Sequence, residues 1–356
     1  MTENLHLIVA GMATAWDLVA GSFAMFFSRF HWLSLGSATL LAFACWLYQR
    51  RGDPAESGKS FLAFLFPRKV WLHRSALLDY RFVLFDKLAL GLLIGLAGLA
   101  SQWIANDVAS PSGASPLAGP LPSVPILIAY TFALLLFGDF MRYWGHRIMH
   151  DVPLLWQFHK VHHSPEVLVP FSQMRTHPVN GIVNLIRSGI AIGVVTGAFL
   201  LIFPGKLTAI SVLGVNAGRL LFDVMGSNLR HSHVWLSFGP RLSHVFISPA
   251  QHQIHHSKAP EHRNRNYGSQ FAIWDWMFGT LYVPQGRERL TFGIDRDSTE
   301  RMQSIRALYL EPFKDAAKLW RARRGGGRNA RAELHRQPSR TRKHAEEPAK
   351  ARHAQG

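Results

Sequence analysis

Two features that decide the fold meet in one stretch, Ser123-Val-Pro-Ile-Leu-Ile-Ala-Tyr-Thr-Phe-Ala-Leu-Leu-Leu-Phe-Gly-Asp-Phe-Met141 followed by Arg142-Tyr-Trp-Gly-His146-Arg-Ile-Met-His150. The first part approaches the roughly 20 mostly apolar residues that a helix needs to cross a bilayer. In the second part, residues four apart share one face of a helix, so His146 and His150 project in the same direction. The stretch therefore predicts a membrane helix that ends in a pair of metal-binding side chains.

Two further histidine boxes follow, His159-Lys-Val-His162-His163 and His252-Gln-Ile-His255-His256. On a helix, positions i, i+3 and i+4 form a compact triangle. Divalent transition metals bind neutral imidazole nitrogens at about 2 Å. Clustered imidazoles without a metal would leave lone pairs unpaired, or would become charged together and repel. The three boxes therefore predict a metal centre.

The number of histidines indicates two ions, because three or four would suffice for one zinc ion. All-nitrogen ligation with open positions favours two iron ions that use O2 as co-substrate, although zinc can replace iron in a purified sample. Cys45 is the only cysteine, which excludes disulfides and cysteine-ligated clusters within the chain.

A ninth ligand is expected between the second and third boxes, where Asn228-Leu-Arg-His231-Ser-His233 follows an apolar run. His231 is favoured over His233. Ligating histidines usually donate their other N–H to a carboxylate or carbonyl group. The candidates for additional ligands or for such partners are His177, His233, Asp139, Asn266 and Asp275. No catalytic residue beyond the metal ligands is expected.

The composition points to a membrane protein. Hydrophobic residues make up 48% of the chain and charged residues only 17%, below the roughly 25% usual in soluble domains. The expected fold is an all-α polytopic bundle of about four to six transmembrane helices, with a cytoplasmic helical cap that carries the histidine boxes. Candidate spans are residues 6–27, 32–48, 86–104, 123–141, 182–203 and 207–225.

The distribution of charge sets the expected orientation and argues against a nucleic-acid partner. Of the formal net charge of +17, the segment 318–356 carries +9, from twelve Lys and Arg and three Glu. The remaining basic residues flank apolar runs, as the positive-inside rule requires of cytoplasmic loops. Both termini and the histidine boxes are therefore expected in the cytoplasm, with the chain in a bacterial inner membrane.

The same patterns divide the chain into four parts. We expect an N-terminal transmembrane hairpin over residues 1–60, a catalytic membrane domain over 61–290 and a C-terminal extension over 291–317. Residues 318–356 form a basic tail with too few apolar residues to build a core, so disorder is expected there.

These motifs resemble the fatty acid hydroxylase and sterol desaturase superfamily of membrane di-iron oxygenases. The resemblance rests on four pieces, which together cover roughly residues 60–290: Asp139-Phe-Met-Arg-Tyr-Trp-Gly-His146-Arg-Ile-Met-His150; Trp156-Gln-Phe-His159-Lys-Val-His162-His163-Ser164; His252-Gln-Ile-His255-His256-Ser257; and Asn266-Tyr267-Gly268 with Trp274-Asp275-Trp-Met-Phe278-Gly279-Thr280. Upstream, Trp71-Leu-His-Arg-Ser75-Ala-Leu-Leu-Asp79-Tyr80 is similar to bacterial members. One departure is Gly226, where many relatives carry a histidine; His231 or His233 is expected to compensate.

The resemblance implies an O2-dependent oxidoreductase that hydroxylates or desaturates a C–H bond of a lipid, such as a sterol, a fatty acid or a related isoprenoid or ether lipid. No flavin motif, dinucleotide fingerprint or cytochrome-b5-like domain is present, so electrons are expected from a separate ferredoxin- or cytochrome-type system. The alternative is a histidine-rich membrane metal transporter or metal-binding protein. A transporter would place ionisable ligands near the middle of its spanning helices, whereas these boxes lie beyond the helix ends.

Overall fold

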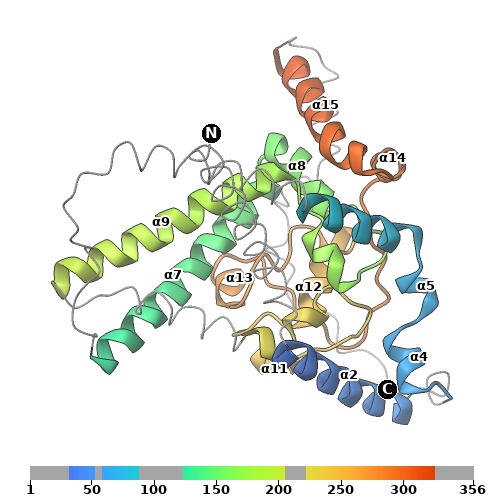
Figure 1. Ribbon diagram of the computed structural model, residues 1–356, viewed down its shortest axis with the longest axis horizontal. Helices are drawn as coiled ribbons and strands as arrows, with labels where there is room; N and C mark the ends of the chain where they lie inside the picture. The colour runs from blue at the N-terminus through green and yellow to red at the C-terminus, as the bar shows by residue number, and fades with distance from the viewer. Residues whose placement is uncertain (1–31, 53–57, 88–122, 205–221, 325–356) are drawn as a thin grey trace, which may run out of the picture.

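The computed structural model describes residues 32–52, 58–87, 123–204 and 222–324. Over these residues the chain is helical, and the one β-type feature is an isolated bridge between Phe246 and Phe271. Residues 74–87 form a helix; the other helices, shown in Figure 1, are α2 (Trp32–Gly52), α4 (Phe61–Leu65), α5 (Arg68–Trp71), α7 (Val124–Asp151), α8 (Pro153–His163), η1 (Pro170–Met174), α9 (Pro178–Ile202), η2 (Ser227–Leu229), α11 (Gly239–Leu242), α12 (Pro249–His255), η3 (Pro260–His262), α13 (Ile273–Met277), α14 (Arg296–Arg301) and α15 (Ile305–Arg324). The expected all-α class is confirmed for this part of the chain.

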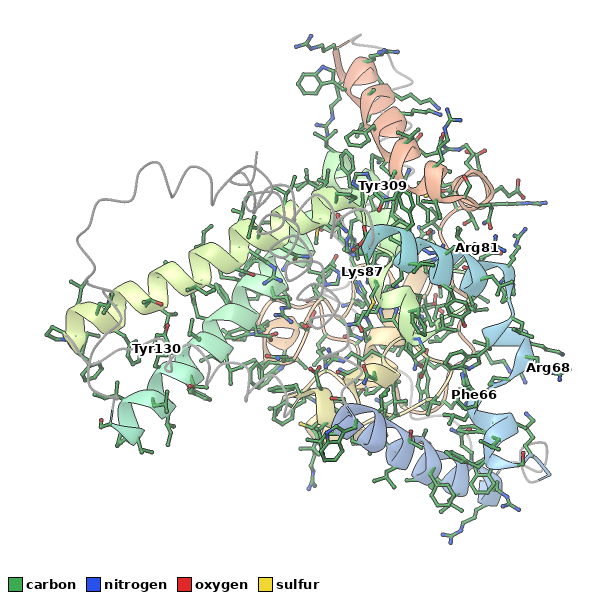
Figure 2. All side chains as sticks on the ribbon, in the orientation of Figure 1. Phe66, Arg68, Arg81, Lys87, Tyr130 and Tyr309 are labelled. Atoms are coloured by element: carbon green, nitrogen blue, oxygen red, sulfur yellow. The ribbon has the colours of Figure 1, made fainter. Side chains whose placement is uncertain are left out.

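The long helices α7 and α9 pack against each other and project together from the rest of the molecule (Figure 1). Each has a proline in its first turn, where the missing N–H costs nothing. The Tyr130 hydroxyl lies 2.8 Å from the Thr196 hydroxyl, and the Tyr130 ring meets Phe199 edge to face. Figure 2 places Tyr130 in the outer half of this hairpin.

Both helices of the hairpin are long and apolar enough to cross a membrane, and they are the two such helices among the described residues. Only 17% and 11% of their most apolar windows are buried, whereas the core helix of a soluble protein would be mostly buried. At about 1.5 Å per residue, the 28 residues of α7 reach about 42 Å. A hydrocarbon core is about 30 Å thick, so α7 is long enough to extend beyond it.

The larger number of spans expected from the sequence is not confirmed. The spans at 6–27, 86–104 and 207–225 lie wholly or largely outside the described residues. The span at 32–48 corresponds to α2, which is a helix but is not among the candidate spans. Its residues Ala38, Ala42 and Trp46, four apart on one face, pack against a cluster that includes Phe64 and Val234.

The C-terminal helices pack onto the helix that carries the second histidine box. Leu308 of α15 is fully buried in a cluster with Leu78, Phe82 and Val161 of α8. The Tyr309 hydroxyl also donates to Asp86 at 2.8 Å, and Figure 2 shows Tyr309 beside the helix of residues 74–87. The helix α15 continues to Arg324, beyond the start of the tail expected at residue 318, because Ala316 and Leu319 extend its buried face.

Candidate metal centre

The first histidine box occupies the last two turns of α7. His146 and His150 are four residues apart, and their ring centroids are 5.1 Å apart. Both rings also approach His159 and His255, with centroid separations of 4.5 to 4.9 Å. The helix thus presents its first box to the other two boxes, as the spacing predicts.

The second box lies on α8, which starts at Pro153 and is separated from the end of α7 by one residue. His159, His162 and His163 are all buried, with exposed fractions of 3%, 9% and 5%. Adjacent positions on a helix are about 100° apart. His162 and His163 therefore face different neighbours: His162 lies against His231, and His163 lies against His150.

The third box lies on α12, a helix of seven residues with a strong N-terminal cap. The Ser248 hydroxyl accepts a hydrogen bond from the Gln251 N–H, and the Gln251 side-chain oxygen accepts one from the Ser248 N–H. Such a reciprocal capping box satisfies two backbone donors that the helix itself leaves unpaired. It fixes the start of α12 just before His252, although the helix is too short to be stable by itself.

The fold gathers nine histidines into two neighbouring groups. One contains His146, His150, His159, His163 and His255; the other contains His162, His231, His252 and His256. Within each group, one ring nitrogen from every residue lies within 4.8 Å of the others. The groups adjoin, because the rings of His163 and His256 stack with centroids 4.4 Å apart. These nine are the histidines that the sequence predicts as ligands.

In the group of five, the Nε2 atoms are buried and have no hydrogen-bond partner among the described residues. In two of these rings the other nitrogen, Nδ1, contacts a backbone carbonyl oxygen. His146 Nδ1 lies 2.9 Å from the Tyr267 carbonyl oxygen, and His255 Nδ1 lies 2.8 Å from that of Arg265. A carbonyl oxygen can only accept, so both rings carry their proton on Nδ1 and direct an Nε2 lone pair into the group.

The Asn180 side chain supports His159 in the same way. Its amide nitrogen lies 3.2 Å from His159 Nδ1, and its Oδ1 has no partner among the described residues. An amide rotated by 180° would place Oδ1 against Nδ1, where it would accept the proton of His159. The lone pair of His159 would then also point into the group.

The histidines outside the spanning candidates are held neutral. Burial and then the neighbouring imidazoles lower the pKa of His159, His163 and His255 well below the ordinary value. Burial also lowers the pKa of His162 to about 3. Five converging, neutral, unpaired lone pairs in a buried space are costly without a cation. The residues therefore fit a transition-metal ion.

The group of four is closer packed. His252 Nε2 lies 3.0 Å from His231 Nε2 and 3.2 Å from His256 Nε2. Three ring nitrogens therefore converge, and each of these two contacts can hold at most one proton. Ser172 of η1 holds His231 from behind, with Oγ 3.1 Å from Nδ1. A cation among the three Nε2 atoms would remove the contact between lone pairs, so this group also fits a metal ion.

Asp139, Asn266 and Asp275, expected as additional ligands or as their partners, lie in neither group. They hold the loop of residues 266–275 beside the group of five. Asp139 accepts hydrogen bonds from the Gln270 and Phe271 N–H groups and from the Trp274 indole. Asn266 has a left-handed backbone, with φ of 56°, and bonds the Gln251 carbonyl of α12.

Asp275 accepts from the N–H groups of Tyr267 and Gly268, and from the Thr280 hydroxyl. Burial raises the pKa of Asp275 to about 6, while these donors favour its ionised form. Because the carbonyl of Tyr267 contacts His146 Nδ1, this carboxylate helps to position a histidine of the first box.

The remaining two candidates also lie outside both groups. His177 caps the start of α9, where its Nδ1 accepts from the Val179 N–H, and its Nε2 lies 3.1 Å from the Tyr309 carbonyl. His233 Nε2 lies 2.7 Å from the Phe64 carbonyl. Both histidines join elements of the fold.

A buried ion pair behind the second box was not anticipated as part of the site. Arg175 is 1% exposed and pairs with Asp79; its guanidinium also donates to the Ser75 carbonyl and to Ser164 Oγ. The backbone of Arg175 also acts on His162, where it raises the pKa of the imidazole against the larger lowering effect of burial. The signal available in the sequence was the similarity of the segment Trp71–Tyr80 to bacterial relatives, since that segment supplies Ser75 and Asp79.

Residues 131–280 match the family model described as fatty acid hydroxylase. This match contains all three boxes and the loop held by Asp139 and Asp275. The similarity to the fatty acid hydroxylase family therefore extends over 150 of the 356 residues. The resemblance expected from the boxes is therefore confirmed.

Relatives of this segment are named for several different lipids. Similar proteins include an alkylglycerol monooxygenase of Caenorhabditis elegans (29% identical, covering 45% of this chain and 28% of the relative), an ornithine lipid hydroxylase of Rhizobium tropici (29%, covering 45% and 44%) and a Delta(7)-sterol 5(6)-desaturase of Gibberella zeae (31%, covering 42% and 37%). The chain spans less than half the length of each. No solved structure matches it.

Proposed function

We propose that this chain is a membrane-bound di-iron oxygenase that uses O2 and external electrons to hydroxylate or desaturate a C–H bond of a lipid. The observation that carries the proposal is the convergence of nine imidazoles in two adjoining groups, inside a segment of the fatty acid hydroxylase family. The relatives with this segment are monooxygenases, hydroxylases and desaturases of lipids.

Each group would hold one iron ion. His146, His150, His159, His163 and His255 would ligate the first, and His162, His231, His252 and His256 the second. When bound, the irons supply the oxidising chemistry with O2. The work of the chain is to keep the nine rings neutral and aimed. For His146 and His255 it does so through the Tyr267 and Arg265 carbonyls, which fix the protonated nitrogen and raise the basicity of the ligating one.

The surroundings suit a lipid substrate. The hairpin of α7 and α9 presents a largely uncovered apolar surface, and the first box lies at the end of α7. We place the hairpin in the membrane, with the boxes and both termini in the cytoplasm. The substrate would enter from the bilayer, and a separate ferredoxin- or cytochrome-type donor would deliver electrons. Residues 1–60 would add a transmembrane hairpin to the 61–290 catalytic domain.

The test combines metal content with lipid chemistry. Protein purified without oxygen and loaded with iron should contain about two irons per chain. Comparative lipidomics of a deletion strain and a complemented strain should reveal one lipid that differs by an oxygen atom or by two hydrogens. His163→Ala should abolish complementation, while His244→Ala, at an exposed histidine outside both groups, should not. Full turnover by His163→Ala, or an active protein without a transition metal, would reject the proposal.

The same preparation addresses the alternative of a metal transporter. Metal-dependent flux in proteoliposomes, together with unchanged lipids in the deletion strain, would favour transport over oxidation. The placement of the boxes argues for oxidation. The group of five forms at the end of α7, where it meets α8 and α12, and the group of four forms between α8, α12 and the segment after η2, so neither lies in the middle of a candidate span.

A further inference from the structure

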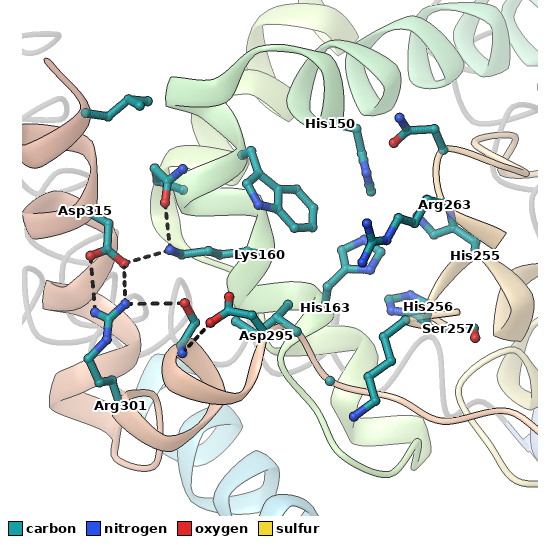
Figure 3. Close-up of a pocket in the computed structure, with 18 of the residues that line it drawn as sticks. His150, Lys160, His163, His255, His256, Ser257, Arg263, Asp295, Arg301 and Asp315 are labelled. Atoms are coloured by element: carbon teal, nitrogen blue, oxygen red, sulfur yellow. Dashed lines mark hydrogen bonds and ion pairs between the residues drawn. The ribbon is translucent and has the colours of Figure 1, made fainter. Parts of the chain in front are cut away.

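A cavity of about 440 Å³ opens beside the group of five histidines. Figure 3 shows His150, His163, His255 and His256 on one side of it, with Lys160 and Asp315 on the other. The histidine side comes from α7, α8 and α12, and the opposite side from α8, α14 and α15. A molecule bound in this cavity would therefore lie against the metal ligands.

The carboxylates that line the cavity already have partners. Asp315 accepts from Lys160 Nζ at 2.7 Å and from Arg301 at 3.1 Å. Asp295 caps α14 by accepting from the Ser298 N–H at 2.9 Å. Asp315 is thus paired with two cations, and Asp295 is held at the start of α14.

Two cations on the histidine side are not balanced in this way. Lys258 and Arg263 line the cavity, and both side chains are exposed. No carboxylate in residues 32–52, 58–87, 123–204 or 222–324 forms an ion pair with either. Their backbone is nevertheless fixed: the Lys258 N–H donates to the Thr291 carbonyl, and the Arg263 N–H closes the turn η3 on Pro260. The cavity therefore carries surplus positive charge on two side chains whose backbone is held in place.

We infer that this cavity binds the anionic headgroup of the lipid substrate, a phosphate or a carboxylate, through Lys258 and Arg263. The inference rests on the proposed function. A concave space of this volume suits a small ligand. A headgroup held beside the histidines would place the first carbons of the lipid next to the metal centre.

The inference is tested by lipid binding to the full-length, iron-loaded protein in neutral detergent. The probes are palmitoyl-lysophosphatidic acid, palmitoylglycerol with the same chain, and inorganic phosphate. The double variant Lys258→Gln/Arg263→Gln removes both charges. Its matched control, Arg68→Gln/Lys69→Gln, removes one Arg and one Lys from exposed positions on α5 that do not line the cavity. Metal content and thermal unfolding verify that both variants are folded.

The wild-type protein and the control should bind lysophosphatidic acid more tightly than palmitoylglycerol, and salt should weaken that preference. The cavity variant should bind lysophosphatidic acid on the order of tenfold more weakly, equivalent to about 1.4 kcal/mol, with palmitoylglycerol unchanged. Equal binding of both lipids by the wild-type protein, or no loss in the variant, would overturn the inference.

Two further outcomes would also overturn it. Inorganic phosphate that binds as tightly as the lysolipid would indicate a soluble anion as the ligand. A variant that loses affinity only for an acidic ferredoxin would indicate a docking site for a protein. Failure of the proposed function is separate, because it would appear as absent iron or unchanged lipids while the charge-dependent binding persists.

Discussion

Asp275 and His146 act on the same residue from opposite sides. Asp275 Oδ1 accepts the Tyr267 N–H at 2.8 Å, and the Tyr267 carbonyl lies 2.9 Å from His146 Nδ1. The carboxylate therefore sets the direction of the His146 lone pair through one peptide unit. Its neighbour Gly268 donates to Asp275 Oδ2 at 2.7 Å, which fixes the orientation of that unit.

The first prediction concerns this relay. Asp275→Asn should lower the free energy of unfolding by about 2–4 kcal/mol, because an amide cannot accept from all the buried donors that the carboxylate satisfies. It should also weaken iron binding about 10–100-fold, as is usual when the partner of a ligating histidine is disturbed. Thermal unfolding and iron titration measure the two effects. The control is Asp297→Asn, whose side chain is 82% exposed; similar losses in both variants would contradict the relay.

The second prediction concerns the division into two groups. His255→Ala should leave the group of four intact, and His252→Ala should leave the group of five intact. Each variant should therefore retain about one iron per chain, and the double variant should retain almost none. Elemental analysis combined with Mössbauer spectroscopy distinguishes the sites. If either single variant kept the full iron content, the assignment of ligands to groups would be wrong.

The third prediction concerns Gly268. A Cβ atom at this position would collide with the Phe271 carbonyl oxygen and would lie 2.7 Å from Asp275 Oδ2. Gly268→Ala should therefore destabilise the protein by about 1–3 kcal/mol or more and lower its iron content. A Cβ atom added at Gly181 on α9 would have no atom within 4 Å. Gly181→Ala should therefore be neutral or slightly stabilising, because alanine favours helix. Thermal unfolding compares the two; a tolerated Gly268→Ala would show that the loop can move without cost.

The fourth prediction concerns the attachment of α15 to α8. Lys160 and Asp315 form an ion pair with side chains only 6% and 10% exposed. Asp315→Ala leaves Lys160 buried without its counter-ion, so we expect a loss of about 3–5 kcal/mol. Lys160→Met/Asp315→Ala should recover part of that loss. Glu300→Ala, at an exposed pair with Arg296, should change stability by less than about 1 kcal/mol. Chemical denaturation measures the free energy of unfolding of all three variants. Equal losses in Asp315→Ala and Glu300→Ala would show that the ion pair does not hold α15 to α8.

Local helical periodicity was sufficient to predict the three boxes as clusters of side chains, because spacings of three and four residues share a face whatever the rest of the chain does. It could not predict which histidines share an ion. His162 and His163 are neighbours in sequence and belong to different groups. That division depends on how α8 is rotated against α7 and α12, which is a property of packing.

The choice between His231 and His233 shows the same limit. Both follow η2 and are two residues apart, and the sequence offers no local reason to prefer one strongly. In the fold, His231 Nε2 lies 3.0 Å from His252, whereas His233 bonds the Phe64 carbonyl of α4. The supporting partners Tyr267, Asn180 and Ser172 are likewise distant in sequence from the histidines that they hold.

The sequence by itself determined that this chain is helical, strongly apolar in places, and rich in histidines at helical spacing, because these properties depend on composition and on a repeat of 3.6 residues. The tertiary structure decided the two groups, the carbonyls that aim each ring and the basic cavity beside them. These depend on contacts between residues far apart in the sequence, such as Lys160 and Asp315, which are 155 positions apart. Such contacts follow from packing that no local pattern encodes.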